Sequence, residues 1–175
     1  VQANDLHMVQ TLLDKGVDLN FDGPPENNLT PPILTILHAQ DLHTLNVELC
    51  ELLLEHGARA NVKDLYSTPL HALLWTVYND KIATQDKDKI LPLLDLLLQH
   101  GADINAINSD EQTPLSVLNL LAPPQLDNYP NKDLLQQMRE RLLHVQEIEA
   151  SFTPIDFEEV EIHLEDTPSW HLPRH

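Results

Sequence analysis

Apolar residues recur along the chain in short, leucine-rich segments that have the spacing of one face of an α-helix. Positions i, i+3, i+4 and i+7 share a face in such a helix. The first segment follows this pattern at Leu6, Val9, Leu12 and Leu13. Two later segments repeat it within residues 49–54 and 93–98. The pattern therefore predicts three amphipathic helices of one kind, joined by more polar stretches.

A glycine follows each of these segments. Three of the four glycines in the chain, Gly16, Gly57 and Gly101, occupy this one position. Glycine is favoured just past a helix end, because the left-handed conformation needed there costs other residues roughly 1–2 kcal/mol. His56 and His100 lie in the preceding turn, next to the negative end of the helix dipole. A chain so poor in glycine that uses it in one recurring position is built from an internal repeat.

A second recurring signal is the dipeptide Thr-Pro, at residues 30–31, 68–69 and 113–114. A threonine hydroxyl can cap the first turn of a helix, and proline is tolerated at the first helical position. Each unit is therefore predicted to hold a Thr-Pro helix, a connection, a leucine-rich helix, a glycine and an extended stretch that ends at asparagine. Such a two-helix unit cannot bury its apolar faces alone and must stack on its neighbours.

These motifs resemble those of the ankyrin repeat. Residues 68–72 read Thr-Pro-Leu-His-Ala, which matches the family's first-helix signature, and 97–105 match the end of its second helix and the start of its finger loop. The resemblance implies an all-α solenoid of stacked helix pairs with finger loops over residues 1–150. The units are expected at about 1–20, 21–61, 62–105 and 106–150. His71 then resembles a structural histidine that hydrogen-bonds between repeats.

The spacing departs from the family pattern in a way that locates two insertions. The ankyrin period is about 33 residues, whereas the three glycines lie 41 and 44 residues apart. The extra residues are expected between the two helices of a unit, near 39–45 and 79–89. The second insertion is polar and mixed in charge, which predicts an exposed loop with room for an extra helical turn.

The finger tips also differ from those of the family. Its glycine two residues before Thr-Pro is replaced by Asn28, Tyr66 and Glu111. Asparagine tolerates a left-handed turn, but tyrosine and glutamate do so poorly. The tips at Tyr66 and Glu111 are therefore predicted to use other turns.

The last part of the chain holds a closing helix and an acidic tail. Asn131 is expected to cap a helix of about 18 residues with a polar outer face. Six acids and one arginine give residues 151–175 a charge of about −5, and 160–165 alternate as a strand does. We expect this acidic C-terminal tail to have an extended backbone or to be partly disordered. A strand within it would dock on the array, pair with a strand of another chain or stay disordered.

The overall charge limits the classes of partner. The formal net charge of −18 disfavours nucleic acid and anionic membranes, because cationic residues bind both. A protein partner with a basic surface is compatible with this charge, and so is an acidity that only keeps the chain soluble. The chain has no run of about 20 apolar residues that would predict a membrane-spanning helix, and no secretory signal is visible.

Cysteine usage points to a compartment. The single cysteine, Cys50, excludes an internal disulfide framework and fits a reducing environment, so we expect an intracellular location in the cytoplasm or nucleus. The sequence has no initiator methionine and starts inside a repeat, which predicts a fragment or a processed product.

Three patterns that can signal chemistry have stronger structural explanations. Cys50 aligns with a buried aliphatic position, whereas a reactive thiol needs exposure and a nearby positive group. His171 and His175 have metal-like spacing, but Pro173 interrupts them and no third ligand accompanies them. The tail glutamates lack the buried pocket that acid–base chemistry needs. We therefore expect no enzyme activity, no metal and no cofactor.

The resemblance also implies where a partner would bind. Ankyrin-like arrays contact partners through the finger tips and the ends of the first helices. Those positions hold Lys63, Leu65, Tyr66, Ser67, Trp75, Thr76, Leu37, His38, Asp110 and Glu111. Trp75, Tyr66 and Leu65 form the central cluster of this prediction. The other interpretation is that Trp75 caps the core beneath the insertion at 79–89.

The sequence therefore favours a protein–protein interaction module, an ankyrin-like scaffold within a larger polypeptide, whose partner it does not name. One alternative is an acidic inhibitor or mimic that blocks a basic, nucleic-acid-binding partner. Another is a targeting domain of a larger enzyme or of a bacterial effector that works in the host cytosol.

Overall fold

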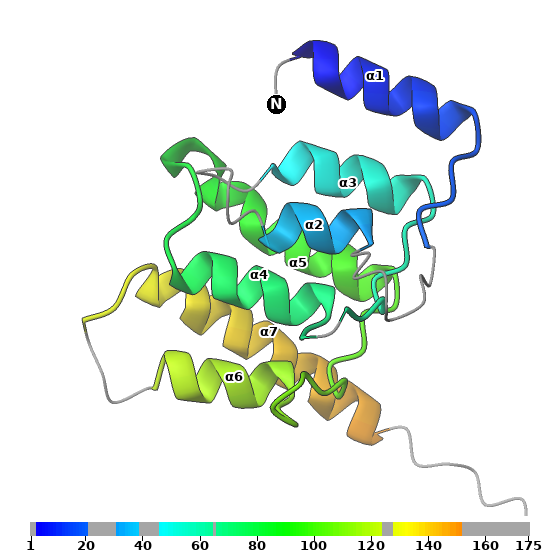
Figure 1. Ribbon diagram of the computed structural model, residues 1–175. Helices are drawn as coiled ribbons and strands as arrows, with labels where there is room; N and C mark the ends of the chain where they lie inside the picture. Colours follow the sequence, from blue (N-terminus) through cyan, green and yellow to red (C-terminus); the bar gives the residue numbers. More distant parts are fainter. Residues whose placement is uncertain (1–2, 21–30, 39–45, 65, 124–127, 152–175) are drawn as a thin grey trace, which may run out of the picture.

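The computed structural model describes residues 3–20, 31–38, 46–64, 66–123 and 128–151. These residues form helices, turns and loops without a strand (Figure 1). The helices are α1 (Ala3–Asp14), α2 (Pro32–His38), α3 (Val47–Glu55), α4 (Pro69–Tyr78), the 3-10 helix η2 (Thr84–Lys89), α5 (Ile90–Gln99), α6 (Pro114–Leu121) and α7 (Lys132–Ser151). The first insertion and the acidic tail with its strand-like segment lie outside the described residues.

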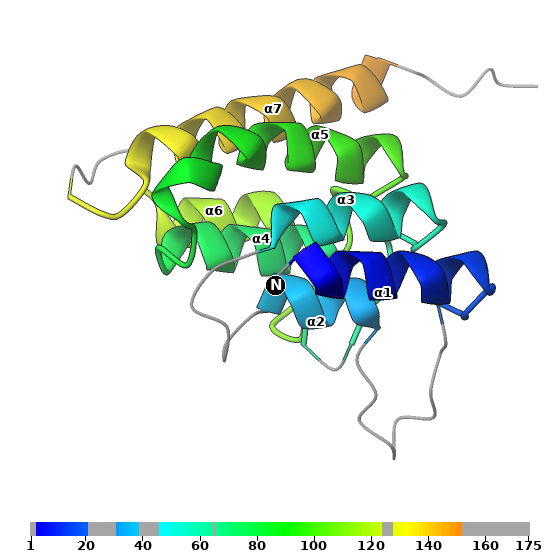
Figure 2. The ribbon, with the colours of Figure 1, turned by 90° about the horizontal axis from the view of Figure 1, so that it is seen from above.

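The helices form two layers. Helices α2, α4 and α6 lie side by side in one layer, and α1, α3, α5 and α7 lie in the other (Figure 2). Each helix of the second layer from α3 onward packs against the first-layer helix that precedes it in the chain. The expected all-α stack of helix pairs is therefore confirmed.

The recurring glycines end the second-layer helices as predicted. Gly16, Gly57 and Gly101 have φ angles of 75°, 91° and 80°, all in the left-handed region. The Gly57 amide donates to the Leu54 carbonyl at 3.1 Å, and the Gly101 amide donates to Leu98 at 3.0 Å. These bonds satisfy carbonyls that a helix end would leave without a donor.

The Thr-Pro signals start helices in different ways. Thr113 caps α6, because its hydroxyl accepts from the Ser116 amide at 3.3 Å. The predicted cap is wrong for Thr68, whose hydroxyl instead hydrogen-bonds to Nδ1 of His71 at 2.8 Å. Thr30 lies outside the described residues, and α2 begins at Pro32.

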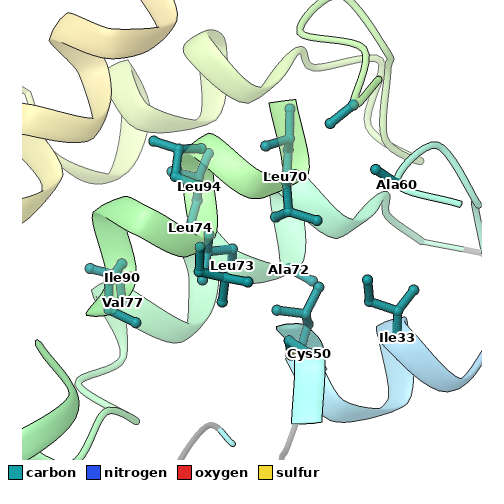
Figure 3. Packing of buried hydrophobic residues seen from close by; sticks show 14 of the residues in the cluster. Ile33, Cys50, Ala60, Leu70, Ala72, Leu73, Leu74, Val77, Ile90 and Leu94 are labelled. Carbon is teal, nitrogen blue, oxygen red and sulfur yellow. The ribbon is translucent and has the colours of Figure 1, made fainter. Parts of the chain in front are cut away.

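The core is aliphatic and lies between the two layers. Figure 3 shows Leu73 and Val77 of α4 together with Ile90 of α5 and Cys50 of α3, all fully buried. Burial, with a smaller contribution from the neighbouring Glu51 carboxylate, raises the pKa of the Cys50 thiol to about 12. The thiol is therefore protonated at neutral pH and packs as a small apolar group.

The insertion at 79–89 is braced against the last helix. The Lys87 ammonium lies 2.6 Å from the side-chain oxygen of Asn131 and 3.2 Å from the Asp80 carboxylate. The Asn131 amide nitrogen donates to the same carboxylate at 2.9 Å and to the Val77 carbonyl at 2.8 Å. These contacts from Asn131 and Lys87 hold the pKa of Asp80 below its usual value. The extra turn expected here is η2, and Ile82 anchors it in the core.

Candidate protein-interaction surface

The middle finger is shaped by an aspartate. One Asp64 carboxylate oxygen accepts from the backbone amides of Tyr66 and Ser67, each at 2.8 Å. A short acidic side chain that bonds to amides two and three residues ahead imposes a tight turn. The turn leaves Tyr66 as the most exposed large apolar residue among those described, with 67% of its surface accessible.

The next finger is built in the same manner and touches the middle one. The Asn108 side-chain oxygen accepts from the amides of Asp110 and Gln112, each at 2.9 Å. The Ser109 amide then donates to the Tyr66 carbonyl at 3.0 Å. The two tips therefore lie side by side and present their exposed residues to the same region of solvent.

Glu111 does not avoid the left-handed conformation, contrary to the sequence-based expectation. Its φ angle is 59°, whereas Tyr66 at the equivalent position of the middle finger has no positive φ. The expectation of another turn is therefore confirmed for Tyr66 and wrong for Glu111. Bonds from the Asn108 side chain to both sides of Glu111 hold the strained residue in place.

Replacing Glu111 with glycine is expected to raise the free energy of unfolding by about 1 kcal/mol, because glycine adopts this conformation without steric cost. The matched control is Tyr66→Gly, which relieves no strain and should leave stability unchanged or lower. Urea titration of the three proteins measures the difference. A destabilised Glu111→Gly protein would contradict the assignment of strain to this residue.

His71 joins the middle first-layer helix to the next finger. Its ring is buried, with Nδ1 bonded to the Thr68 hydroxyl at 2.8 Å and Nε2 bonded to the Gln112 carbonyl at 2.9 Å. A carbonyl only accepts, so Nε2 carries the proton and Nδ1 accepts from the hydroxyl. The inter-repeat role that the resemblance implied for His71 is confirmed.

Stability should fall as the pH drops below about 6.5, the usual pKa of histidine. Burial holds the pKa of folded His71 below this value, so the unfolded chain binds the proton first. The slope attributable to one proton is at most about 1.4 kcal/mol per pH unit. Serine occupies the equivalent position in the next unit, at Ser116, so His71→Ser is the natural control. An unchanged slope between pH 7.5 and 5.5 in that variant would assign the effect to other groups.

Several residues of the predicted partner surface are exposed. Lys63, Asp110 and Glu111 are open to solvent on the fingers, beside Tyr66. Trp75 of α4 is 38% exposed and packs edge-on against Tyr78, with ring centroids 6.2 Å apart at 85°. More than a third of the Trp75 surface is therefore accessible, and both interpretations of this residue, a partner contact or a cap over the core, stay predictions.

Three other predicted residues are buried, which corrects their assignment to the surface. Leu37, Ser67 and Thr76 have almost no accessible area. The Thr76 hydroxyl donates to the Leu37 carbonyl at 2.6 Å, which ties α4 to the end of α2. Their side chains stabilise the stack and are not available to a partner. Leu65 and the side chain of His38 lie outside the described residues.

Leu120 is an exposed apolar residue of the first-layer helices that the sequence reasoning missed. It is 63% accessible on α6. It follows Thr113 by seven residues, as Trp75 follows Thr68, so the register of the Thr-Pro helices would have located it. Ile107, on the finger that Asn108 shapes, is also exposed. We call Tyr66, Trp75, Ile107 and Leu120 the apolar surface set.

Candidate metal ligands do not gather in the described part of the chain. No group of three or more histidine, cysteine, aspartate or glutamate side chains there is placed to hold a metal ion. Within the same residues, no helix is both long and apolar enough to cross a membrane.

Stacked helix pairs with loops that touch one another define a helical repeat protein. No protein-family model matches the chain. It is 39% identical over 116 residues to the ankyrin repeat protein FPV031 of fowlpox virus (strain NVSL), and 34% identical over 76 residues to FPV232, a second ankyrin repeat protein of that virus. These sequence relatives confirm the resemblance of the repeats of this chain to ankyrin repeats.

The matches cover 65% and 43% of this chain but only 29% and 13% of the two viral proteins. The chain therefore spans less than a third of the length of the curated relatives it matches. Among solved structures, the ankyrin repeat domain of Bcl-3, a member of the IkappaB protein family, aligns with a TM-score of 0.45 and 24% identity. That alignment covers 73% of this chain and 45% of the Bcl-3 chain.

Proposed function

We propose that this chain is a protein–protein interaction module that binds its partner through the apolar surface set. The observation that carries the proposal is the exposure of four large apolar side chains on the fingers and first-layer helices: Tyr66, Trp75, Ile107 and Leu120. A few residues contribute most of the energy at protein interfaces, and tryptophan and tyrosine are enriched among them. The ankyrin repeats of the viral relatives support the general class.

The surroundings of these anchors suit an interface. Lys63, Asp110 and Glu111 are exposed next to Tyr66 on the two fingers. Protein interfaces combine a central apolar patch with a polar rim that stays in contact with water. The braced fingers and the packed α4 helix hold the anchors in place before binding, which lowers the entropic cost of association.

The double variant Tyr66→Ala/Trp75→Ala should weaken partner binding by about 4 kcal/mol, close to a thousandfold, if each anchor contributes about 2 kcal/mol. The matched control is Leu143→Ala/Ile148→Ala, which removes two exposed apolar side chains from α7 in the other layer. Binding is measured by titrating a partner captured with the unmodified chain. Equal losses in the two variants, or none in the first, would overturn the proposal.

A second candidate function rests on the net charge of −18. An acidic inhibitor or mimic would occupy a basic partner, and its affinity would fall steeply with salt because exposed charges are screened. Raising the salt concentration from 50 to 500 mM, conditions chosen to span weak and strong screening, separates the two functions. Affinity carried by the apolar surface set changes little over this range, whereas affinity carried by charge collapses.

A further inference from the structure

Helix α1 lies at one end of the stack (Figure 1). It exposes a leucine at a position where the other glycine-terminated helices, α3 and α5, bury theirs. Leu12, Leu53 and Leu97 each lie four residues before the glycine that ends their helix. Leu53 and Leu97 are 3% and 0% accessible, whereas Leu12 is 47% accessible. The position is a core position of the repeat, and α1 alone leaves it open.

A second position on the same face of α1, Met8, is also more exposed than its equivalents in the later helices. Met8 lies eight residues before its glycine, as Leu93 does in α5. Leu93 is fully buried and Leu49, the equivalent residue of α3, is half-buried, whereas Met8 is 65% accessible. Met8 and Leu12 are four residues apart, so they lie next to each other on one face of α1. Together they form an apolar stripe turned away from the stack.

The difference follows from how the layers are paired. Helices α3, α5 and α7 each pack against a first-layer helix that precedes them, namely α2, α4 and α6. No such helix precedes α1 within the described residues. The side of α1 that would meet its own first-layer helix and the preceding unit is therefore uncovered.

The opposite end of the stack is finished differently. One row of α7 is polar and exposed, at Asp133, Gln137, Glu140, His144 and Glu147, although Leu143 and Ile148 beside it are also 39% and 44% accessible. Repeat arrays need a polar outer face on the unit that ends the stack. One end of this array therefore has the character of a cap, and the α1 end has the character of an internal repeat.

We propose that the Met8–Leu12 face of α1 is a stacking interface for a further helix pair of the same kind, supplied by polypeptide that precedes residue 1. The member of this pair that contacts α1 is a first-layer helix like α4, with an apolar side that packs on α1. The proposal rests on the burial of Leu53 and Leu97, the equivalents of Leu12, and of Leu93, the equivalent of Met8 in α5. The length of the viral relatives, of which the matched region is less than a third, allows room for such a unit.

The test is the reactivity of a thiol placed on this face. Leu12→Cys is prepared in the 175-residue chain and in the natural polypeptide extended upstream, and its reaction with a disulfide reagent is followed. We expect labelling to be at least about tenfold slower in the longer polypeptide, because the thiol reacts only when the helix pair opens. Met8→Cys provides an independent measurement should Leu12→Cys fold poorly. Cys50 is buried and its thiol pKa is about 12, so it adds little background.

The control is Leu120→Cys on α6, which is exposed far from α1 and should react equally in both polypeptides. Equal labelling of Leu12→Cys in the two lengths would overturn the proposal. Protection that appears in the 175-residue chain and grows with its concentration would also overturn it, since a second copy would then cover the face. A coding sequence with no helix-forming segment upstream would do the same.

Discussion

Replacing Arg139 with methionine is expected to lower the free energy of unfolding by about 3 kcal/mol, because two buried carbonyls lose a charged donor. The Arg139 guanidinium is buried in α7 and donates from Nη2 to the carbonyls of Leu118 and Ala122, at the end of α6. Its Nη1 donates to the Gln136 side chain at 2.8 Å. Arg139 therefore closes the C-terminal end of α6 from the neighbouring layer.

The loss of these bonds is opposed by the free-energy cost of burying the guanidinium cation, which methionine does not incur. Arg139 Nε is buried without a hydrogen-bond partner, so methionine relieves one unfavourable contribution. Methionine offers no hydrogen-bond donor, however. The Leu118 carbonyl keeps its bond from the Ala122 amide at 2.9 Å, but the buried Ala122 carbonyl loses its charged donor, and an unpaired buried acceptor costs about 1–3 kcal/mol. We expect the loss to exceed the gain.

The matched control is Arg141→Met on the same helix. Arg141 is partly exposed and pairs with Asp95 of α5. Exposed ion pairs contribute about 0–1 kcal/mol, so this variant should lose little stability. Chemical denaturation of both proteins gives the comparison. An Arg139→Met protein as stable as the parent would contradict this expectation. It would show that the free-energy cost of burying the guanidinium equals the stabilisation from its hydrogen bonds.

Replacing Asn61 with alanine is expected to cost about 2 kcal/mol, since two hydrogen bonds between repeats are lost. The Asn61 side chain donates to the Gly101 carbonyl and accepts from the Asp103 amide at 2.5 Å. Asn20 makes the same pair of bonds one unit earlier, to the Gly57 carbonyl at 2.8 Å and the Arg59 amide at 2.7 Å. Each asparagine thus ties its unit to the glycine turn of the next.

Asn105 supplies the control for this tie. It occupies the same position in the third unit, but the sequence has no glycine after α7 to form an equivalent turn. The Asn105 side chain instead donates to the exposed Glu149 carboxylate at 3.2 Å. Asn105→Ala should therefore cost less than about 1 kcal/mol. Thermal unfolding of the two alanine variants is the measurement. Equal losses at 61 and 105 would contradict the tie between repeats.

Much of this architecture could be predicted from the sequence because its signals are local. A glycine after a leucine-rich helix requires a left-handed residue whatever the surroundings, and Gly16, Gly57 and Gly101 all adopt it. The Thr-Pro starts and the extra turn in the second insertion are local in the same sense. The asparagine that ends each extended stretch was visible as a pattern, but its partners lie about 40 residues away and could not be read from it.

The surface was harder to predict because exposure depends on neighbours. Thr76 follows Trp75 directly on α4, yet one is buried and bonded to α2 while the other faces solvent. Family position alone placed both on the binding face, whereas the helical register separates them and adds Leu120. Glu111 shows the same limit, since bonds from Asn108 override its low preference for a left-handed turn.

The central claim is that a protein partner contacts the fingers and first-layer helices. A photo-crosslinking amino acid placed at Leu120, or at Tyr66, tests it most directly in the native host. The account predicts a discrete adduct with one protein at both positions, and none from Leu143 on α7, which is also exposed, at 39% of its surface. Crosslinking from Leu143 with no adduct from either finger or first-layer position would contradict it.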